Sequence, residues 1–202
     1  MVRGFSEEER SRIHSQILDA ARTTLAAEGY MKVTIRSLAQ AVGISVGTFY
    51  LFFASKEELL FAVLEREEQV LKQQLFSEGL LKEPLTRRSL ADFLQKAFTL
   101  AHQNPIIRQA VNAQVYQKMT AGISPETMAA HAAQDQMDLT PLLKHWRHQG
   151  RLTSVDDAVL SGALRAVFLL SLHEDVIGAP VFEDVVSFWI NALAAAVVVE
   201  EG

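Results

Sequence analysis

The chain has 202 residues, of which 49% are hydrophobic, and a formal net charge of −5. This length is enough for one good core or two small ones. The absence of cysteine excludes disulfides, thiol catalysis and thiol redox sensing. The N-terminal sequence MVRGFSEEERSR lacks the apolar stretch of a signal peptide, and the apolar runs 163–172 and 193–199 fall short of the about 20 residues of a membrane span. We therefore expect a soluble cytoplasmic protein with no membrane partner.

Helix signals recur along the whole sequence. Ser, Thr, Asn or Pro precedes each apolar-periodic segment, and Gly follows most of them. No stretch shows the sustained period-two alternation of a strand. We expect an all-α protein of about nine helices, over residues 6–28, 34–42, 45–52, 56–79, 86–103, 105–121, 124–149, 154–172 and 182–199.

Capping residues mark several of these starts. Ser6 with Glu9 and Ser55 with Glu58 have the spacing of capping boxes. Asn104 followed by Pro105 is typical of a cap and a first helical residue. Ser154, followed by two acidic residues, predicts the start of the eighth helix.

The segment TIRSLAQAVGISVGTFYLFF, residues 34–53, predicts two short helices around a tight turn. Thr34 is a suitable N-cap for the first helix, and Gly43 can take the left-handed conformation that ends it. Ser45 then caps the second helix. This arrangement is a helix-turn-helix, whose second helix enters the major groove of DNA.

The sequence Gly47-Thr48-Phe49-Tyr50, followed by Phe53 and Ser55-Lys56-Glu57-Glu58-Leu59, resembles the signature of the TetR family of one-component transcriptional regulators. The resemblance covers about residues 13–60. It implies a helix-turn-helix DNA-binding domain at 1–56 and a helical ligand-binding and dimerisation domain at 57–202. Residues 1–56 carry seven Lys or Arg and five acids, a balance of +2, which leaves −7 for the remainder. A positive sign is expected of the segment that meets phosphate.

Four residues are candidates for contacts to the DNA backbone. Thr34 and Ser45 begin helices, where free backbone N–H groups point at anions. Resemblance to the family implies that Thr34, Tyr50 and Lys56 contact phosphate. The alternative for Tyr50 is packing against the first helix.

The candidates for base contacts are Arg36 and the first residues of the recognition helix, Val46, Gly47 and Thr48. Arg36 has the side chain for bidentate recognition of guanine, although it also fits a solvated surface position. Val46 and Thr48 are suited to a thymine methyl, and Gly47 permits close backbone approach. Val46 and Leu51 depart from the polar or aromatic residues common at these family positions, so we expect sparse hydrogen-bond readout and a contribution from DNA shape.

The second domain holds aromatic, Met and His residues suited to a mostly apolar small-molecule site. The predicted ligand-binding set is Phe61, Phe98, His102, Tyr116, Met119, Met137, Trp146, Phe168 and His173. The alternative is that these residues fill the core. A metal site at His145 and His148, or at 173–175, is disfavoured because Lys144 and Arg147 flank the first pair and no third ligand has a fixed spacing. We expect neither a metal nor a cofactor.

The last two helices are apolar on nearly all sides, which predicts burial against more than one partner. The two helices of one protomer and the same two of its partner are expected to form a four-helix bundle across the two-fold axis of a homodimer. The predicted interface is Leu164, Phe168, Leu172, Phe188, Trp189, Ala192, Leu193 and Ala196. The alternative is a central hairpin covered by the three preceding helices.

Together these patterns predict a ligand-responsive DNA-binding regulator, a repressor released from a palindromic operator by a largely apolar small molecule. One alternative is a helical DNA-binding dimer without an effector. Another is an all-helical enzyme, but dyads such as His173 with Asp175 lie in no recognisable motif, so we expect no catalytic activity.

Overall fold

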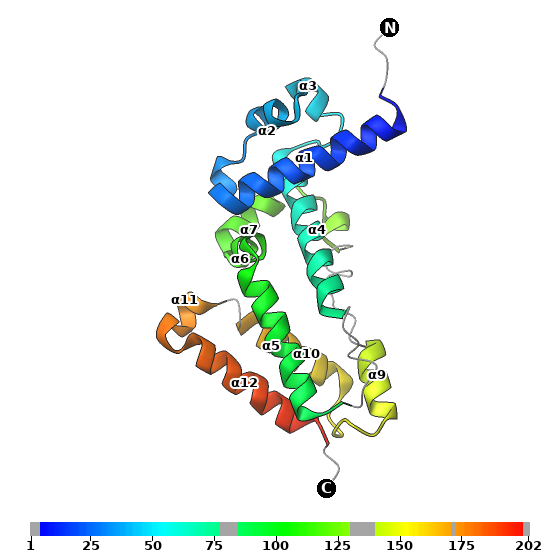
Figure 1. The fold of residues 1–202 in the computed structure, drawn as a ribbon, viewed down its shortest axis with the longest axis vertical. Coiled ribbons are helices and arrows are strands. Elements are labelled where there is room, and N and C mark those ends of the chain that lie inside the picture. Colours follow the sequence, from blue (N-terminus) through cyan, green and yellow to red (C-terminus); the bar gives the residue numbers. More distant parts are fainter. Residues whose placement is uncertain (1–4, 77–84, 130–139, 171–172, 200–202) are drawn as a thin grey trace. The chain divides into compact units, whose positions relative to one another are not determined.

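The computed structural model describes residues 5–76, 85–129, 140–170 and 173–199 (Figure 1). The all-α prediction is confirmed. The elements in order are α1 (Glu7–Glu28), η1 (Tyr30–Lys32), α2 (Ile35–Val42), α3 (Val46–Phe49), α4 (Lys56–Phe76), α5 (Arg87–Gln103), α6 (Pro105–Val111), α7 (Ala113–Thr120), α9 (Thr140–His148), α10 (Asp157–Leu170), α11 (Glu174–Ile177), η2 (Ala179–Val181) and α12 (Phe182–Val197). An isolated antiparallel bridge joins Leu152 to Val198.

Side chains cap the N-terminal helices as their sequence predicts. The Ser6 hydroxyl accepts from the Glu9 N–H at 3.1 Å, and the Glu9 carboxylate accepts from the Ser6 N–H at 2.9 Å. Hydrogen bonds to Ser6 lower the pKa of Glu9. Ser55 also caps its helix, but the Glu58 carboxylate accepts from the Ala54 N–H, one residue before the predicted partner.

Four predicted helices differ from the observed ones. The helix predicted at 45–52 ends at Phe49, and residues 50–52 form a turn. The helix predicted at 105–121 is divided, because the Asn112 side chain accepts from the N–H groups of Gln114 and Val115 and so starts α7. The helix predicted at 154–172 starts at Asp157, since Asp156 and not Ser154 provides the cap. Of the helix predicted at 124–149, backbone at 125–129 and α9 are helical, and 130–139 lie outside the described residues.

The described residues group into two compact units. The first holds residues up to Gln69 together with the segment that begins at Pro105, and the second holds Val70–Asn104 and the chain from α9 onward. This grouping follows packing, because α6 contacts α1. The domain boundary between residues 56 and 57 remains a prediction.

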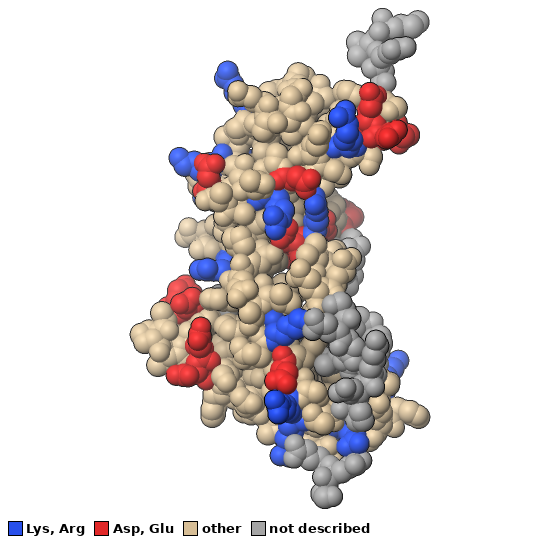
Figure 2. Space-filling view, in the orientation of Figure 1, with Lys and Arg blue, Asp and Glu red and all other residues tan. Residues whose placement is uncertain are grey.

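The first unit carries the helix-turn-helix. Ile17, Leu25, Leu38 and Phe49 are fully buried in it, where α2 packs against α1 and α3 packs against α2. Polar contacts add to this packing. The Gln109 side chain donates to the Leu25 carbonyl at 2.8 Å and accepts from the Tyr30 N–H at 3.2 Å, which ties α6 to the end of α1. On the face drawn in Figure 2, the surface over α2 and α3 shows few charged side chains.

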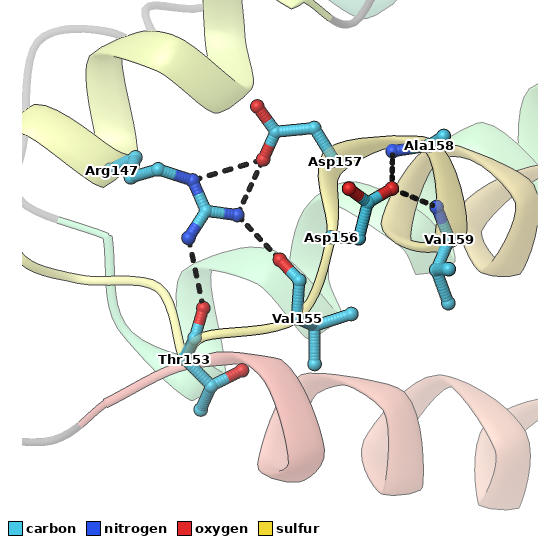
Figure 3. Close-up of polar contacts among 7 residues, drawn as sticks. All are labelled: Arg147, Thr153, Val155, Asp156, Asp157, Ala158 and Val159. Carbon is cyan, nitrogen blue, oxygen red and sulfur yellow. Dashed lines mark hydrogen bonds and ion pairs between the residues drawn. The ribbon is translucent and has the colours of Figure 1, made fainter.

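The second unit is built around α12, which packs on α5 and on α10. Phe93, Trp146, Leu160, Val186 and Ile190 are among the residues of its apolar core. Arg147 fixes the connection into α10 by donating to the carbonyls of Thr153 and Val155 and pairing with Asp157 (Figure 3). Arg147 is therefore engaged within the protein and does not belong to a purely solvated face.

Candidate nucleic-acid interface and sensor region

The turn between α2 and α3 has the conformation that its sequence predicts. Gly43 adopts the left-handed region with φ 76° and ψ 30°, and the Ile44 N–H donates to the Ala39 carbonyl at 2.9 Å. Thr34 and Ser45 cap the two helices through bonds from the N–H groups of Ser37 and Thr48. The side-chain caps and the left-handed Gly43 therefore fix the backbone at the start of α2 and at the start of α3.

Several predicted contact residues are accessible on this unit. The exposed fractions are 42% for Val46 and 52% for Tyr50, while Arg36 and Gly47 are also exposed. Tyr50 makes an edge contact with the ring of Phe49, which itself is buried, so most of the phenol faces solvent. Thr48 is partly buried, and its hydroxyl lies 2.8 Å from that of Ser45. These positions are compatible with the predicted DNA contacts, which remain predictions.

Lys56 has intramolecular partners that its sequence context did not indicate. Its ammonium lies 4.0 Å from the centre of the Tyr30 ring and donates to the Tyr30 carbonyl at 3.4 Å. The Tyr30 hydroxyl lies 3.2 Å from the Glu57 carboxylate and 3.3 Å from the Lys118 carbonyl. Burial, and then the nearby Glu57 charge, raises the pKa of Tyr30. A phosphate at Lys56 would therefore meet an ammonium held in place by an aromatic ring.

A second unpredicted contact joins α1 to the end of the recognition helix. The Arg10 guanidinium donates to the Leu51 carbonyl at 3.2 Å and lies 5.6 Å from the centre of the Phe52 ring. Phe5 also packs near Phe52, with ring centroids 6.2 Å apart. Arg10 and Leu51 are far apart in the sequence, and no local pattern marks the pair.

The predicted ligand-binding residues divide between the two units. Phe61, Tyr116 and Met119 belong to the first unit, and Phe98, His102, Trp146 and His173 belong to the second. Met137 lies outside the described residues, and the side chain of Phe168 is not among those described. Phe61, Phe98, Met119 and Trp146 are buried, so the core-filling alternative describes their positions in the free chain.

Phe98 and His102 are brought together as their spacing predicts. Their rings stack with centroids 5.4 Å apart, and Phe182 lies 5.6 Å from His102. The His102 Nε2 is 3.8 Å from the Glu174 carboxylate. Phe182 and Glu174 were missed in the sequence, because they follow these residues by more than 70 positions. We call Phe98, His102, Glu174 and Phe182 the α5–α12 cluster.

Trp146 is the largest fully buried side chain of the second unit, and its indole nitrogen has no hydrogen-bond partner within the described part of the chain. No group of three or more His, Asp or Glu suited to a metal ion occurs among the described residues. His145 instead lies 3.1 Å from the Gln149 side-chain amide.

An open apolar groove of about 490 Å³ runs between α10 and α12. Its lining residues are Ala163, Ala166, Val167, Leu170, Trp189, Ala192, Leu193 and Ala196. Phe188 is 65% exposed and Trp189 48% exposed beside it. Val159, Leu169 and Leu170 are also exposed, although they were not among the predicted interface residues.

Two predicted interface residues do not contribute to this surface in the described structure. Leu164 is buried in the core of its own chain, because it packs with Leu160 and Val167 on the inward side of α10. Leu172 lies outside the described residues.

By length and mean hydropathy, Ala179–Val197 is sufficient for a membrane span, which counting uninterrupted apolar runs did not predict. Phe182, Val186 and Ile190 within it are buried in the core of the second unit, but only 28% of the stretch is buried in total. This single stretch is a weak indication of a membrane.

Residues 17–63, which include the capped helices and the turn, match the family model for bacterial regulatory proteins of the tetR family. The N-terminal part of this chain is therefore similar to the DNA-binding segment of TetR-family regulators. Over 76 residues it is 37% identical to an HTH-type transcriptional repressor of Mycobacterium tuberculosis, a match that covers 38% of this chain and 41% of that protein. Over 91 residues it is 34% identical to the nucleoid occlusion factor SlmA of Haemophilus ducreyi, covering 45% of each protein.

The matched segments therefore span less than half the length of these curated relatives. A similarity that extends over nearly the whole chain is found in a solved structure. The solved complex of RolR with resorcinol has a TM-score of 0.60 and 20% sequence identity, and the alignment covers 96% of this chain and 92% of that one. This likeness shows a shared fold.

Proposed function

We propose that this protein is a DNA-binding transcriptional repressor that binds a palindromic operator as a homodimer in the cytoplasm and is released by a small molecule. The observation that carries the proposal is a helix-turn-helix with capped helices and an accessible recognition face in a segment that matches the tetR family model. The similarity of this segment to a mycobacterial transcriptional repressor supports the assignment.

The exposed apolar groove between α10 and α12 supports the homodimer. Soluble monomers rarely leave large side chains such as Phe188 and Trp189 exposed beside an apolar groove. A second copy of the same surface would cover them around a two-fold axis. Two recognition helices would then reach successive major-groove faces about one helical turn apart.

The α5–α12 cluster supports an effector site in the second unit. It combines three rings with one carboxylate, which suits a small and largely apolar molecule that carries a polar group. The shared fold with RolR, whose structure contains resorcinol, is consistent with such a ligand. Release requires that the effector bind the DNA-free arrangement more tightly than the DNA-bound one.

Operator binding is tested by fluorescence anisotropy on DNA selected from a random double-stranded library, as a function of salt. Lys56→Ala should weaken binding and reduce the slope of log K against log salt by about 0.9 for each phosphate that is no longer neutralised. Tyr50→Phe should weaken binding without changing that slope, because it removes a hydroxyl and not a charge. The matched controls are Lys144→Ala and Tyr116→Phe, which lie outside the helix-turn-helix and should bind as the wild type does. Failure to select any sequence would refute the proposed function.

A second candidate function is DNA binding without a small-molecule effector. The observation that favours it is the match to a nucleoid occlusion factor over the 91-residue alignment. Thermal denaturation with a metabolite panel separates the two, because an effector stabilises the folded protein according to its concentration and Kd. A compound that raises the Tm and releases operator DNA supports the repressor, and a panel that does neither supports the second candidate.

A further inference from the structure

The recognition helix and its flanks lack the side chains that usually read bases. Residues 41–55, AVGISVGTFYLFFAS, contain no Arg, Lys, His, Asn, Gln, Asp or Glu. Those residue types make the bidentate or charged contacts to base edges in the major groove. The low number of charged side chains over α2 and α3 in Figure 2 agrees with this composition. Sequence recognition by this helix must therefore use hydroxyl groups or apolar contacts.

The two hydroxyl groups near the start of the helix are partly engaged with each other. The Ser45 oxygen accepts from the Thr48 N–H at 2.9 Å as the helix cap, and the two hydroxyls lie within 2.8 Å of each other. One of their two hydrogens is used in that contact. Tyr50 provides a third hydroxyl on the exposed side, at the position predicted above to contact phosphate.

The exposed side of the helix is otherwise apolar. Phe49 and Phe53 are buried and fix the inward side. α3 ends at Phe49, and the turn that follows continues it with bonds from the Leu51 N–H to the Thr48 carbonyl and from the Phe52 N–H to the Phe49 carbonyl. Val46 is 42% exposed and Leu51 59% exposed. The Arg10 bond to the Leu51 carbonyl holds this backbone in place, so the Leu51 side chain projects from a fixed point.

Thymine is the base that offers an apolar group in the major groove, because its C5 methyl projects there. We infer that Val46 and Leu51 read thymine methyl groups, so that each operator half-site is selected for thymines at the positions that face them. This inference rests on the proposed DNA-binding function. Gly47 lies between the two side chains in sequence, and its missing side chain leaves room for the edge of the base pair.

The test replaces thymine by deoxyuracil, which removes the methyl and keeps the base-pairing groups. Operator DNA is first selected from a random double-stranded library, and each thymine is then replaced in turn. Removal of a contacted methyl should weaken binding by about fourfold, the equivalent of burying one methyl-sized group. In Leu51→Ala the same replacement at the position facing Leu51 should change affinity by less than about 1.5-fold, since the partner group is gone.

Val176→Ala is the matched control, because Val176 is exposed on α11 in the second unit. This variant should lose as much affinity for deoxyuracil DNA as the wild type does. Wild-type binding that is unchanged by deoxyuracil at every thymine overturns the inference and leaves the proposed function intact. An equal loss in wild type and in both Leu51→Ala and Val46→Ala also overturns it, because the methyl would then act on DNA shape. Absence of any selected DNA refutes the proposed function itself.

Discussion

Replacing Arg22 by Met would remove a guanidinium that pairs with the buried carboxylate of Glu67 in the first unit. The Arg22 Nε lies 2.5 Å from one Glu67 oxygen, and a second guanidinium nitrogen lies 3.4 Å from the other. The Glu67 side chain is only 4% exposed, whereas that of Arg22 is 47% exposed. The pairing raises the pKa of Arg22, and it joins α1 to α4.

Removing one partner of a fully buried ion pair costs about 3–5 kcal/mol. Water reaches Arg22 in the folded protein, so a discounted loss of about 2–3 kcal/mol is expected for Arg22→Met. At about 2–4 °C per kcal/mol for a chain of this size, the Tm should fall by roughly 4–12 °C. Arg66 and Asp19 supply a control between the same two helices, because they pair at 2.7 Å with side chains that are 44% and 58% exposed. Arg66→Met should cost less than about 1 kcal/mol.

Urea unfolding followed by circular dichroism measures these losses. Both tryptophans, Trp146 and Trp189, lie in the second unit, so their fluorescence reports whether that unit unfolds in the same transition. Arg22→Met combined with Glu67→Leu should recover part of the lost stability, since the buried charge is removed as well. Equal losses in the Arg22 and Arg66 variants would refute the assignment of a buried, desolvated pair.

Three further predictions concern the turn, the α6 contact and the dimer. Gly43→Ala should lower the free energy of unfolding by about 1–2 kcal/mol, because Gly43 has a left-handed φ of 76°. Gly47→Ala should not lower it. Urea unfolding of the two variants measures the difference. Gln109→Ala should cost about 1–3 kcal/mol, as it leaves two backbone groups without their side-chain partner, and an unchanged denaturation midpoint would contradict this. Phe188→Glu should give a monomer in sedimentation velocity, while exposed Val176→Glu should not; a dimeric Phe188→Glu would refute the interface.

Helix starts were predictable from the sequence because a cap acts within one turn. Ser6, Thr34 and Ser45 each hold an N–H group three residues ahead, so all the residues that make the cap lie inside a short window. The same locality explains why Gly43 could be assigned to its turn. Asn112 has an equally local role, but the apolar pattern continues across it, and periodicity outweighed the cap in the prediction.

Contacts between distant residues could not be predicted in this way. Gln109 bonds to groups about eighty positions earlier in the chain, and Phe182 lies a similar distance from His102. The Lys56 ammonium packs on Tyr30 because η1 carries that ring to the start of α4, which no spacing rule indicates. Candidate residues were therefore found by type, and their partners became visible only in the fold.

The route of the chain through the two units limits how this protein can be recombined with others. The chain leaves the first unit after Gln69 and returns to it at Pro105 to contribute α6 and α7. A chimera joined at a single point after the helix-turn-helix would leave α6 behind and remove the Gln109 contacts from the end of α1. Transferring the first unit to another protein thus requires three junctions, because the chain crosses between the units after Gln69, before Pro105 and again after Ala133.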